Sequence, residues 1–141
     1  MQIKLKIKKL KDVNLPKYEH RGDAGLDLFA AETVVIGVGQ KIAVPTGIAM
    51  EIPEGYVGLV WDKSGLAIKQ GLKTLGGVID SGYRGEVMVG IINLGTTDYT
   101  IEKNHKVAQM LIQKKEWVDV VEVSELSDSE RGVGGFGSTG K

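Results

Sequence analysis

The sequence predicts an all-β sandwich or barrel that carries one short helix and ends in a flexible, glycine-rich arm. Short runs rich in Val, Ile and Thr recur along the chain at intervals of about ten residues, a spacing typical of sandwiches and barrels. Turn signals built on glycine and proline separate these runs. One segment alone has the composition of a helix, and the last ten residues but one contain five glycines.

The strand series begins at the N-terminus, where residues 1–8 alternate apolar and polar side chains as a half-buried strand does. A turn at Pro53-Glu54-Gly55 separates the next two runs. The strands expected after the first cover residues 42–50, 56–61, 86–93, 97–101, 106–113 and 118–123.

The single helix is expected over residues 64–71. Ser64 is a candidate N-cap, a short apolar stretch follows, and Gly71 is a candidate stop. Trp61 and Trp117 are expected in the core or in an interface. Residues 124–130 are acidic and serine-rich. We therefore expect a β domain over residues 1–123, and a linker with a flexible lid over residues 124–141.

Composition narrows the class of protein. With 141 residues the chain is long enough for one domain, and 42% hydrophobic residues indicate a globular one. Eighteen basic and eighteen acidic residues give a net charge of zero, which argues against stable nucleic-acid binding or a membrane surface. There is no cysteine, no apolar leader and no run that could span a bilayer. These features predict a soluble protein of the cytoplasm.

Two internal segments carry residues suited to chemistry. Lys63 and Ser64 stand where a strand gives way to the helix, so an ammonium, a hydroxyl and free backbone N–H groups could hold a phosphate. An ordinary capped helix is the alternative. Asp80 ends an apolar run and opens a turn that contains Tyr83. Held by rigid strands, the Asp80 carboxylate could orient and deprotonate a water; a plain hairpin with a turn aspartate is the alternative.

Arginine usage adds a further indication. The chain has fifteen lysines but three arginines, Arg21, Arg84 and Arg131, and the guanidinium fork suits phosphate better than an ammonium does. For Arg84 a salt bridge that stiffens the turn is an equal alternative. His20 and His105 lie far apart without other ligands at metal-binding spacing, so both are expected on the surface.

The glycine-rich arm combines free backbone with a few functional groups. Arg131, Ser138 and Thr139 could bind phosphate oxygens, and Phe136 could stack on a base. This composition predicts a mobile flap that orders over a nucleotide. A disordered polar tail is the alternative.

Five segments, taken in order, resemble the five motifs of the homotrimeric dUTP diphosphatases (dUTPases). They cover residues 24–28, 63–67, 77–85 and 106–110, and the arm. The resemblance implies a jelly-roll β protomer, three of which share three active sites. It also implies that Mg²⁺, held through substrate phosphates and water, supports hydrolysis of dUTP to dUMP and pyrophosphate. Such an activity limits uracil incorporation into DNA and supplies dUMP for dTMP synthesis.

The resemblance further implies roles for individual residues. Asp80 would activate the water that attacks the α-phosphorus, and Tyr83 would pack against the deoxyribose. The residues that would read uracil are Thr74, Gly77, Val78, Ile79, Asp80 and Met88. The residues that would hold phosphates are Lys63, Ser64 and Gly65, with Gln109 from a neighbouring subunit. From the arm, Phe136 would stack on the base, while the phosphate end would be bound by Arg131, Gly137, Ser138 and Thr139.

Two departures from the family pattern stand out. Lys63 occupies a position that is usually arginine, and a point ammonium cannot make the fork contact. Residues 104–106 read Asn-His-Lys instead of Gly-Asp-Arg, so an acid–arginine pair is missing.

Two alternatives remain. A dCTP deaminase shares the fold and two of the motifs but needs a glutamate at the position that is Gly90 here. The other alternative is a trimeric scaffold or nucleotide sensor without catalysis, against which Asp80 argues.

Overall fold

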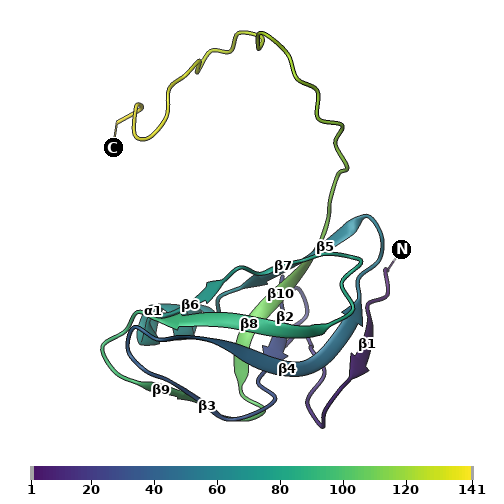
Figure 1. Ribbon diagram of the computed structural model, residues 1–141, viewed down its shortest axis with the longest axis vertical. Helices are drawn as coiled ribbons and strands as arrows, with labels where there is room; N and C mark the ends of the chain where they lie inside the picture. The colour runs from purple at the N-terminus through teal and green to yellow at the C-terminus, as the bar shows by residue number, and fades with distance from the viewer. Residues whose placement is uncertain (1, 141) are drawn as a thin grey trace.

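The computed structural model describes residues 2–140 and shows an all-β body from which the C-terminal arm extends (Figure 1). Two four-stranded antiparallel sheets have the orders β1-β4-β8-β6 and β2-β10-β5-β7, and β3 pairs with β9. The strands are β1 (Lys6–Lys9), β2 (Leu26–Phe29), β3 (Val34–Ile36), β4 (Lys41–Glu51), β5 (Tyr56–Trp61), β6 (Leu72–Leu75), β7 (Val78–Ile79), β8 (Glu86–Asn93), β9 (Tyr99–Ile101) and β10 (Lys106–Lys114). The all-β prediction is confirmed.

The core lies between the two large sheets. Alternate residues of β8, including Val87, Val89 and Ile91, are almost fully buried, which follows from the two-residue period of a strand. The opposite sheet contributes Leu28 and Met110, neither of which exposes any surface. Burial of these side chains supplies the main driving force for packing the sheets together.

The helix α1 (Ser64–Gln70) forms where it was expected, between β5 and β6. Gly71 ends it in the left-handed conformation at φ 74°, and a Cβ there would lie 2.6 Å from the backbone nitrogen of Gly95. The prediction that Ser64 is the N-cap is wrong. Lys63 holds that position and its side chain makes no capping bond, because an ammonium can only donate whereas a cap must accept from a backbone N–H.

The predicted strands between residues 42 and 113 are confirmed, with bounds shifted by two residues at most. The strand predicted over residues 118–123 is wrong, because the last strand of the described residues ends at Lys114 and residues 118–123 pair with no other strand. Trp61 is 52% exposed and Trp117 is 87% exposed, so neither lies in the core of this chain.

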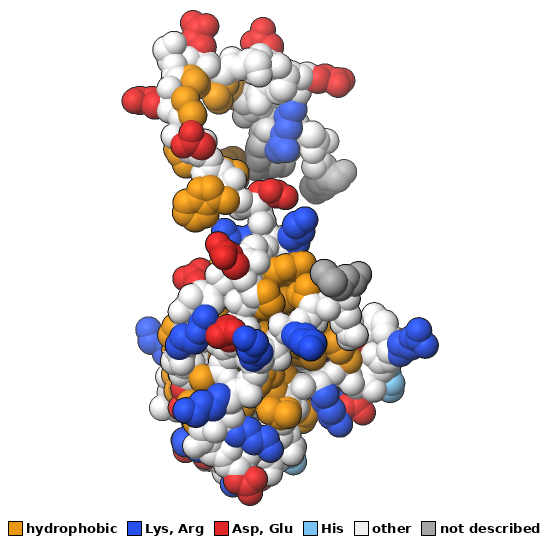
Figure 2. Space-filling model, turned by 90° about the vertical axis from the view of Figure 1, so that its right-hand side faces the viewer, with side chains coloured by type: hydrophobic (Ala, Val, Ile, Leu, Met, Phe, Trp, Pro, Cys, Tyr) orange, Lys and Arg blue, Asp and Glu red, His pale blue; other side chains and the backbone are white. Residues whose placement is uncertain are grey.

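The arm begins after Lys115, whose N–H donates to the carbonyl of Gly55. Residues 116–130 contain six acidic and no basic side chains. Exposed apolar side chains alternate with them, as Figure 2 shows for one face; these are Trp117, Val118, Val120, Val121, Val123 and Leu126. Within residues 2–140, no helix is long and apolar enough to cross a membrane.

Candidate functional site

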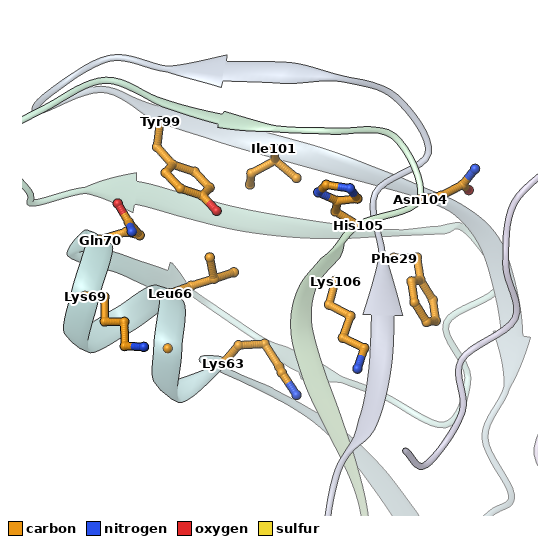
Figure 3. A pocket seen from close by; sticks show the side chains of 11 residues that line it. Phe29, Lys63, Leu66, Lys69, Gln70, Tyr99, Ile101, Asn104, His105 and Lys106 are labelled. Atoms are coloured by element: carbon orange, nitrogen blue, oxygen red, sulfur yellow. The ribbon is translucent and has the colours of Figure 1, made fainter.

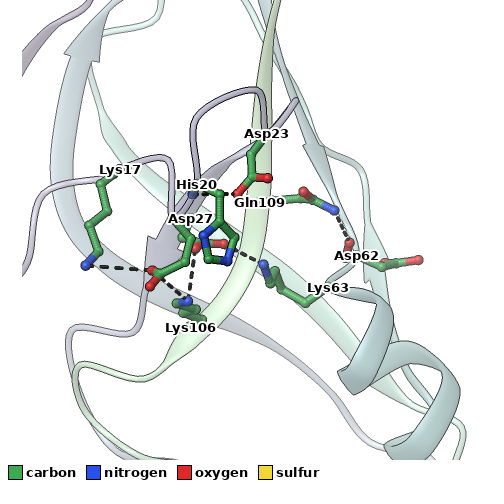
Figure 4. Close-up of polar contacts among 9 residues, drawn as sticks. Lys17, His20, Asp23, Asp27, Asp62, Lys63, Lys106 and Gln109 are labelled. Atoms are coloured by element: carbon green, nitrogen blue, oxygen red, sulfur yellow. Dashed lines mark hydrogen bonds and ion pairs between the residues drawn. The ribbon is translucent and has the colours of Figure 1, made fainter.

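The predicted phosphate-binding residues of the body lie together. Lys63, Ser64, Gly65 and Gln109 of one chain line a pocket of about 340 Å³, so the Gln109 that lies beside Lys63 belongs to the same chain and not, as the resemblance implied, to a neighbouring subunit. The pocket is completed by Asp23, Ala24, Gly25 and Asp27. A Cβ on Gly25 would collide with the side chain of Gln109, so this glycine lets β10 bring Gln109 against the loop. The Gln109 amide Nε2 donates to the carbonyl of Asp62 at 2.8 Å, which fixes its orientation (Figure 4).

A buried carboxylate holds the lysine of this pocket. Asp27 is 2% exposed, and its Oδ1 accepts a hydrogen bond from Lys63 Nζ at 2.6 Å. Its other oxygen, Oδ2, lies 3.2 Å from Lys106 Nζ. Lys106 also pairs with the exposed Glu19 at 3.1 Å (Figure 4). Lys106 thus forms an ion pair with a carboxylate of another strand, Asp27, although the acidic residue of the family pattern is absent from residues 104–106.

The pairs in this network shift pKa values in the directions that stabilise charge. Burial disfavours ionised Asp27, but hydrogen bonds from Lys63 and Lys106 outweigh burial and leave the pKa of Asp27 below its usual value. Hydrogen bonds to Glu19 and then Asp27 raise the pKa of Lys106. Asp27 is therefore a carboxylate at neutral pH, and it holds the side chains of Lys63 and Lys106 beside the pocket.

Four of the six predicted base-reading residues line a second pocket, whereas Thr74 and Gly77 do not. Val78, Ile79, Asp80, Tyr83 and Met88 line about 250 Å³ together with Glu86. Here the chain passes from β6, at the edge of one sheet, to β7, at the edge of the other. Edge strands keep one side of their backbone free of ladder bonds, so the segment over residues 72–79 offers N–H and C=O groups to a ligand.

Glycine makes the passage between the sheets possible. Gly76 and Gly77 both have positive φ, at 68° and 107°, a region that other residues rarely adopt. A Cβ on Gly77 would also lie 2.7 Å from the carbonyl oxygen of Val60. The Gly77 carbonyl in turn accepts the Val60 N–H at 2.8 Å, so the passage at Gly76 and Gly77 is held tightly against β5. Thr74 lies on β6 and is buried rather than lining the pocket.

The turn that carries Asp80 is rigid although the Asp80 side chain is exposed. The Tyr83 N–H donates to the Asp80 carbonyl at 3.1 Å, and Tyr83 Oη donates to the Glu86 carbonyl at 2.8 Å. A Cβ on Gly85 would lie 2.5 Å from Tyr83 Oη, so glycine is needed beneath the ring. The Asp80 carboxylate and the Tyr83 ring are thereby presented on a fixed backbone.

Arg84 stabilises the same turn and links it to β4. Its guanidinium donates to the carbonyl of Ser81 at 2.6 Å and lies 3.5 Å from the carboxylate of Glu51 on β4. These contacts support the structural alternative for Arg84, a side chain that stiffens the turn.

The predicted arm residues line neither pocket. These are Arg131, Phe136, Gly137, Ser138 and Thr139. Arg131 Nε donates to the nearby carbonyl of Gly134 at 2.7 Å, and the Phe136 ring is fully exposed. Within one chain, the predicted phosphate-binding residues and the predicted base-reading residues therefore line separate pockets, and the described arm residues line neither.

A larger pocket of about 550 Å³ adjoins the phosphate pocket, with which it shares Lys63, Gly65 and no other predicted site residue (Figure 3). Its apolar wall is made by Phe29, Leu66, Tyr99 and Ile101. Its remaining lining residues are Lys69, Gln70, Asn104, His105 and Lys106, so none is acidic. Lys69 and Lys106 therefore continue the basic lining that Lys63 begins at the phosphate pocket.

Comparison with known proteins decides the family. A family model described as dUTPase matches residues 11–140. The chain belongs to the dUTPase family. It is 52% identical over 132 residues to the deoxyuridine 5'-triphosphate nucleotidohydrolase of Corynebacterium diphtheriae, covering 92% of this chain and 87% of that one. For the enzyme of the same name from Clostridium acetobutylicum, the identity is 50% over 141 residues, with 98% and 97% covered.

A solved dUTPase has the same fold. The dUTPase of Staphylococcus bacteriophage 80alpha, in a structure with dUpNHpp, superimposes with a TM-score of 0.93 at 34% identity, covering 99% of this chain and 100% of that one. The jelly-roll prediction is confirmed by this match together with the two packed antiparallel sheets.

Family membership also weighs against the deaminase alternative, and the structure adds a steric reason. Gly90 lies on β8, where it pairs with Leu75 of β6. A Cβ there would lie 3.0 Å from the Leu75 carbonyl oxygen. The glutamate that a dCTP deaminase needs would therefore force the hairpin strand aside.

Metal binding in this dUTPase-family chain must be judged from its donors. Among residues 2–140, no group of three or more His, Cys, Asp or Glu side chains is placed to hold a metal ion. His20 and His105 are exposed, as expected. A dUTPase of phage phi11, 30% identical and with a TM-score of 0.82, is described with a structural Mg(II) ion. In this chain Asp27 lines the phosphate pocket but is already bound by two ammonium groups.

Proposed function

We propose that this protein hydrolyses dUTP to dUMP and pyrophosphate by in-line attack of a water on the α-phosphorus. The observation that carries the proposal is the rigid turn that presents the exposed Asp80 carboxylate beside the Tyr83 ring, next to an edge strand with free backbone groups. Family membership supplies the substrate. The cytoplasm, where nucleotides are made, is the proposed location.

The base pocket supports selection of uracil. The free edge of β7 would offer backbone N–H and C=O groups to the polar edge of the base, and Met88 would close the pocket on one side. Family membership implies that contact with the wall of this pocket would exclude the methyl group of thymine. Tyr83, held by its bond to the Glu86 carbonyl, would pack on the deoxyribose and exclude a 2′-hydroxyl.

The phosphate pocket supports binding of the triphosphate. Lys63 would contribute its ammonium, Ser64 its hydroxyl and Gly65 its backbone, and Gln109 would close the pocket. Phosphoryl transfer needs positioning and neutralisation of charge more than covalent chemistry. Mg²⁺ held by the triphosphate oxygens and water would neutralise charge on the phosphates. The donor set of the chain fits this arrangement, because Asp27 is held by two lysines and Asp23, the other carboxylate of the pocket, accepts the backbone N–H of His20.

Asp80 would act as the general base. It would accept a proton from the attacking water, and a positioned base of this kind typically accelerates a reaction by about 10²–10⁴-fold. The arm would then close over the bound nucleotide, with Phe136 on the base and Arg131 among the residues on the phosphates. Closure of a flexible segment excludes water and completes such a site.

A homotrimer with shared sites would unite the separate groups. On the outer face of the sheet, Leu111, Leu59 and Val78 form a row in cross-strand register, and Trp61 and Ile68 are exposed beside Ser64 and Gln109. Water-exposed apolar surface of this kind favours association. A second copy packed here would carry its base pocket toward the phosphate pocket, and a third would supply the arm.

A pyrophosphate-release assay with Mg²⁺ across dUTP, dCTP, dTTP and UTP tests the proposal. We expect turnover with dUTP alone, and we expect Asp80→Asn to lose at least about a hundredfold in kcat while still binding dUTP. Asp98→Asn is a matched control, because Asp98 accepts a backbone N–H from Val38 on a loop outside both pockets. Tight binding of dUTP without turnover by the wild type would favour the sensor alternative instead.

A further inference from the structure

Asp62 ties together three parts of the chain that the proposed function uses separately. It follows β5 directly and precedes Lys63 of the phosphate pocket. Its Oδ1 accepts two hydrogen bonds from Thr74 on β6, one from the backbone N–H at 2.7 Å and one from the hydroxyl at 2.6 Å. Its own peptide carbonyl accepts the Gln109 amide from β10 at 2.8 Å (Figure 4).

The side chain and the backbone of Asp62 therefore face different half-sites. The carboxylate holds Thr74, two residues before the Gly76-Gly77 passage that leads into β7 and the base pocket. The carbonyl holds Gln109, which lines the phosphate pocket. We propose that Asp62 is a positioning residue. Its carboxylate fixes the position of the segment over residues 74–79, which leads into the base pocket, and its carbonyl fixes the orientation of the Gln109 side chain at the phosphate pocket. The proposal rests on the proposed function, because it assumes that the segment over residues 74–79 receives a base.

The carboxylate has the character that such a role requires. Its side chain is 23% exposed and Thr74 is 9% exposed, so the two bonds are largely shielded from water. Burial opposes ionisation of Asp62, but the bonds from the Thr74 hydroxyl and N–H, with that from Lys73, outweigh burial and lower its pKa. Asp62 is thus an anion at neutral pH and makes charge-assisted hydrogen bonds, which are the stronger kind.

The ion pair with Lys73 is a separate and weaker feature. Lys73 Nζ lies 3.0 Å from Asp62 Oδ2, but its side chain is 49% exposed. Exposed ion pairs contribute little. If Asp62 acted merely as a surface ion-pair partner, removal of Lys73 would have the same effect as removal of Asp62. The positioning role predicts instead that Thr74 carries the effect.

Two half-substrates separate the two functions of Asp62. Deoxyuridine probes the base pocket and tripolyphosphate with Mg²⁺ probes the phosphate pocket, each as a competitive inhibitor of dUTP hydrolysis. We expect Asp62→Ala to raise the inhibition constant of deoxyuridine about tenfold, the loss typical of one hydrogen bond to a charged group. The constant for tripolyphosphate should change less than about twofold, because the peptide carbonyl of residue 62 is retained.

Companion variants keep the test decisive if Asp62→Ala unfolds. Thr74→Val removes the hydroxyl at nearly constant shape and should also weaken deoxyuridine, whereas Thr74→Ser should weaken it less. Lys73→Ala should leave both constants unchanged. Equal weakening of both inhibitors, or an effect of Lys73→Ala as large as that of Asp62→Ala, would overturn the positioning role. Absence of dUTP turnover or deoxyuridine binding in the wild type would instead refute the proposed function, and the positioning role with it.

Discussion

Replacement of Asp27 by asparagine should destabilise the protein more than any exposed charge change nearby. The carboxylate is almost completely buried, and it receives Lys63 on one oxygen and Lys106 on the other, at 2.6 and 3.2 Å. Asparagine keeps the size of the side chain and one acceptor oxygen. Its amide group, however, would point two N–H bonds at an ammonium, so one of the two lysines loses its partner.

The magnitude follows from these contacts. A hydrogen bond to a charged group is worth about 1.5–3 kcal/mol, and breaking a buried pair costs about 3–5 kcal/mol. The two lysine side chains are 30% and 37% exposed, so water recovers part of the loss. We therefore expect Asp27→Asn to lower the free energy of unfolding by about 2–3 kcal/mol per chain at neutral pH.

The loss should depend on pH with a defined sign. The pKa of Asp27 is lowered in the folded protein, so its stabilising effect is present above the unfolded value of about 3.9. It disappears as the pH falls through the lower folded value. Urea unfolding at about pH 7 and about pH 3, at one protein concentration because association shifts apparent stability, should show the difference between wild type and variant shrinking at the acidic pH.

Glu19→Gln provides the matched control. Glu19 binds the same Lys106 at 3.1 Å, but its side chain is 42% exposed, so its replacement should be hard to distinguish from wild type. Equal destabilisation by the two variants would refute the reasoning, since burial would then not decide the strength of the pair. A difference between Asp27→Asn and wild type that stays constant with pH would refute it as well.

Three further outcomes are expected. Deletion of residues 131–141 should reduce dUTP turnover by about a hundredfold or more, with unchanged thermal unfolding, since none of residues 131–140 belongs to the buried core; unchanged kinetics would make the arm a simple tail. Lys63→Arg should preserve or raise kcat/KM, because the fork fits phosphate; a large loss would show that the lysine has its own geometry. Gly77→Ala should cost about 1–3 kcal/mol in stability, measured by urea unfolding, because its φ is 107° and its Cβ would meet the Val60 carbonyl; a wild-type midpoint would contradict the strain.

Local signals in the sequence predict those elements whose causes are local. The helix ends at Gly71 because glycine alone accepts the left-handed conformation there without strain, and β8 forms from a continuous run of mostly β-branched apolar residues between Glu86 and Asn93. Residues 118–123 show the limit of this reasoning. Their composition favours a strand, but a strand needs a neighbour, and among the described residues 2–140 no strand pairs with them. The two-residue β7 is the opposite case, since it exists through its pairing with β5.

The site follows the same division between local and distant causes. Residue type alone indicates that Asp80 could activate a water and that Lys63 could bind phosphate, but it cannot say which carboxylate holds which lysine. Asp27 and Lys63 are 36 positions apart, and Asp27 and Lys106 meet because β2 and β10 are neighbours.

Two departures from the family pattern thereby become one physical feature. Lys63 in place of arginine and Lys106 at the end of residues 104–106 each present a single ammonium, and each takes one oxygen of the same carboxylate. A guanidinium would make a two-point contact from one side chain; here two side chains make it from β10 and from the residue before α1. The sequence around each lysine does not show its partner, because both lysines bind Asp27, which lies on β2.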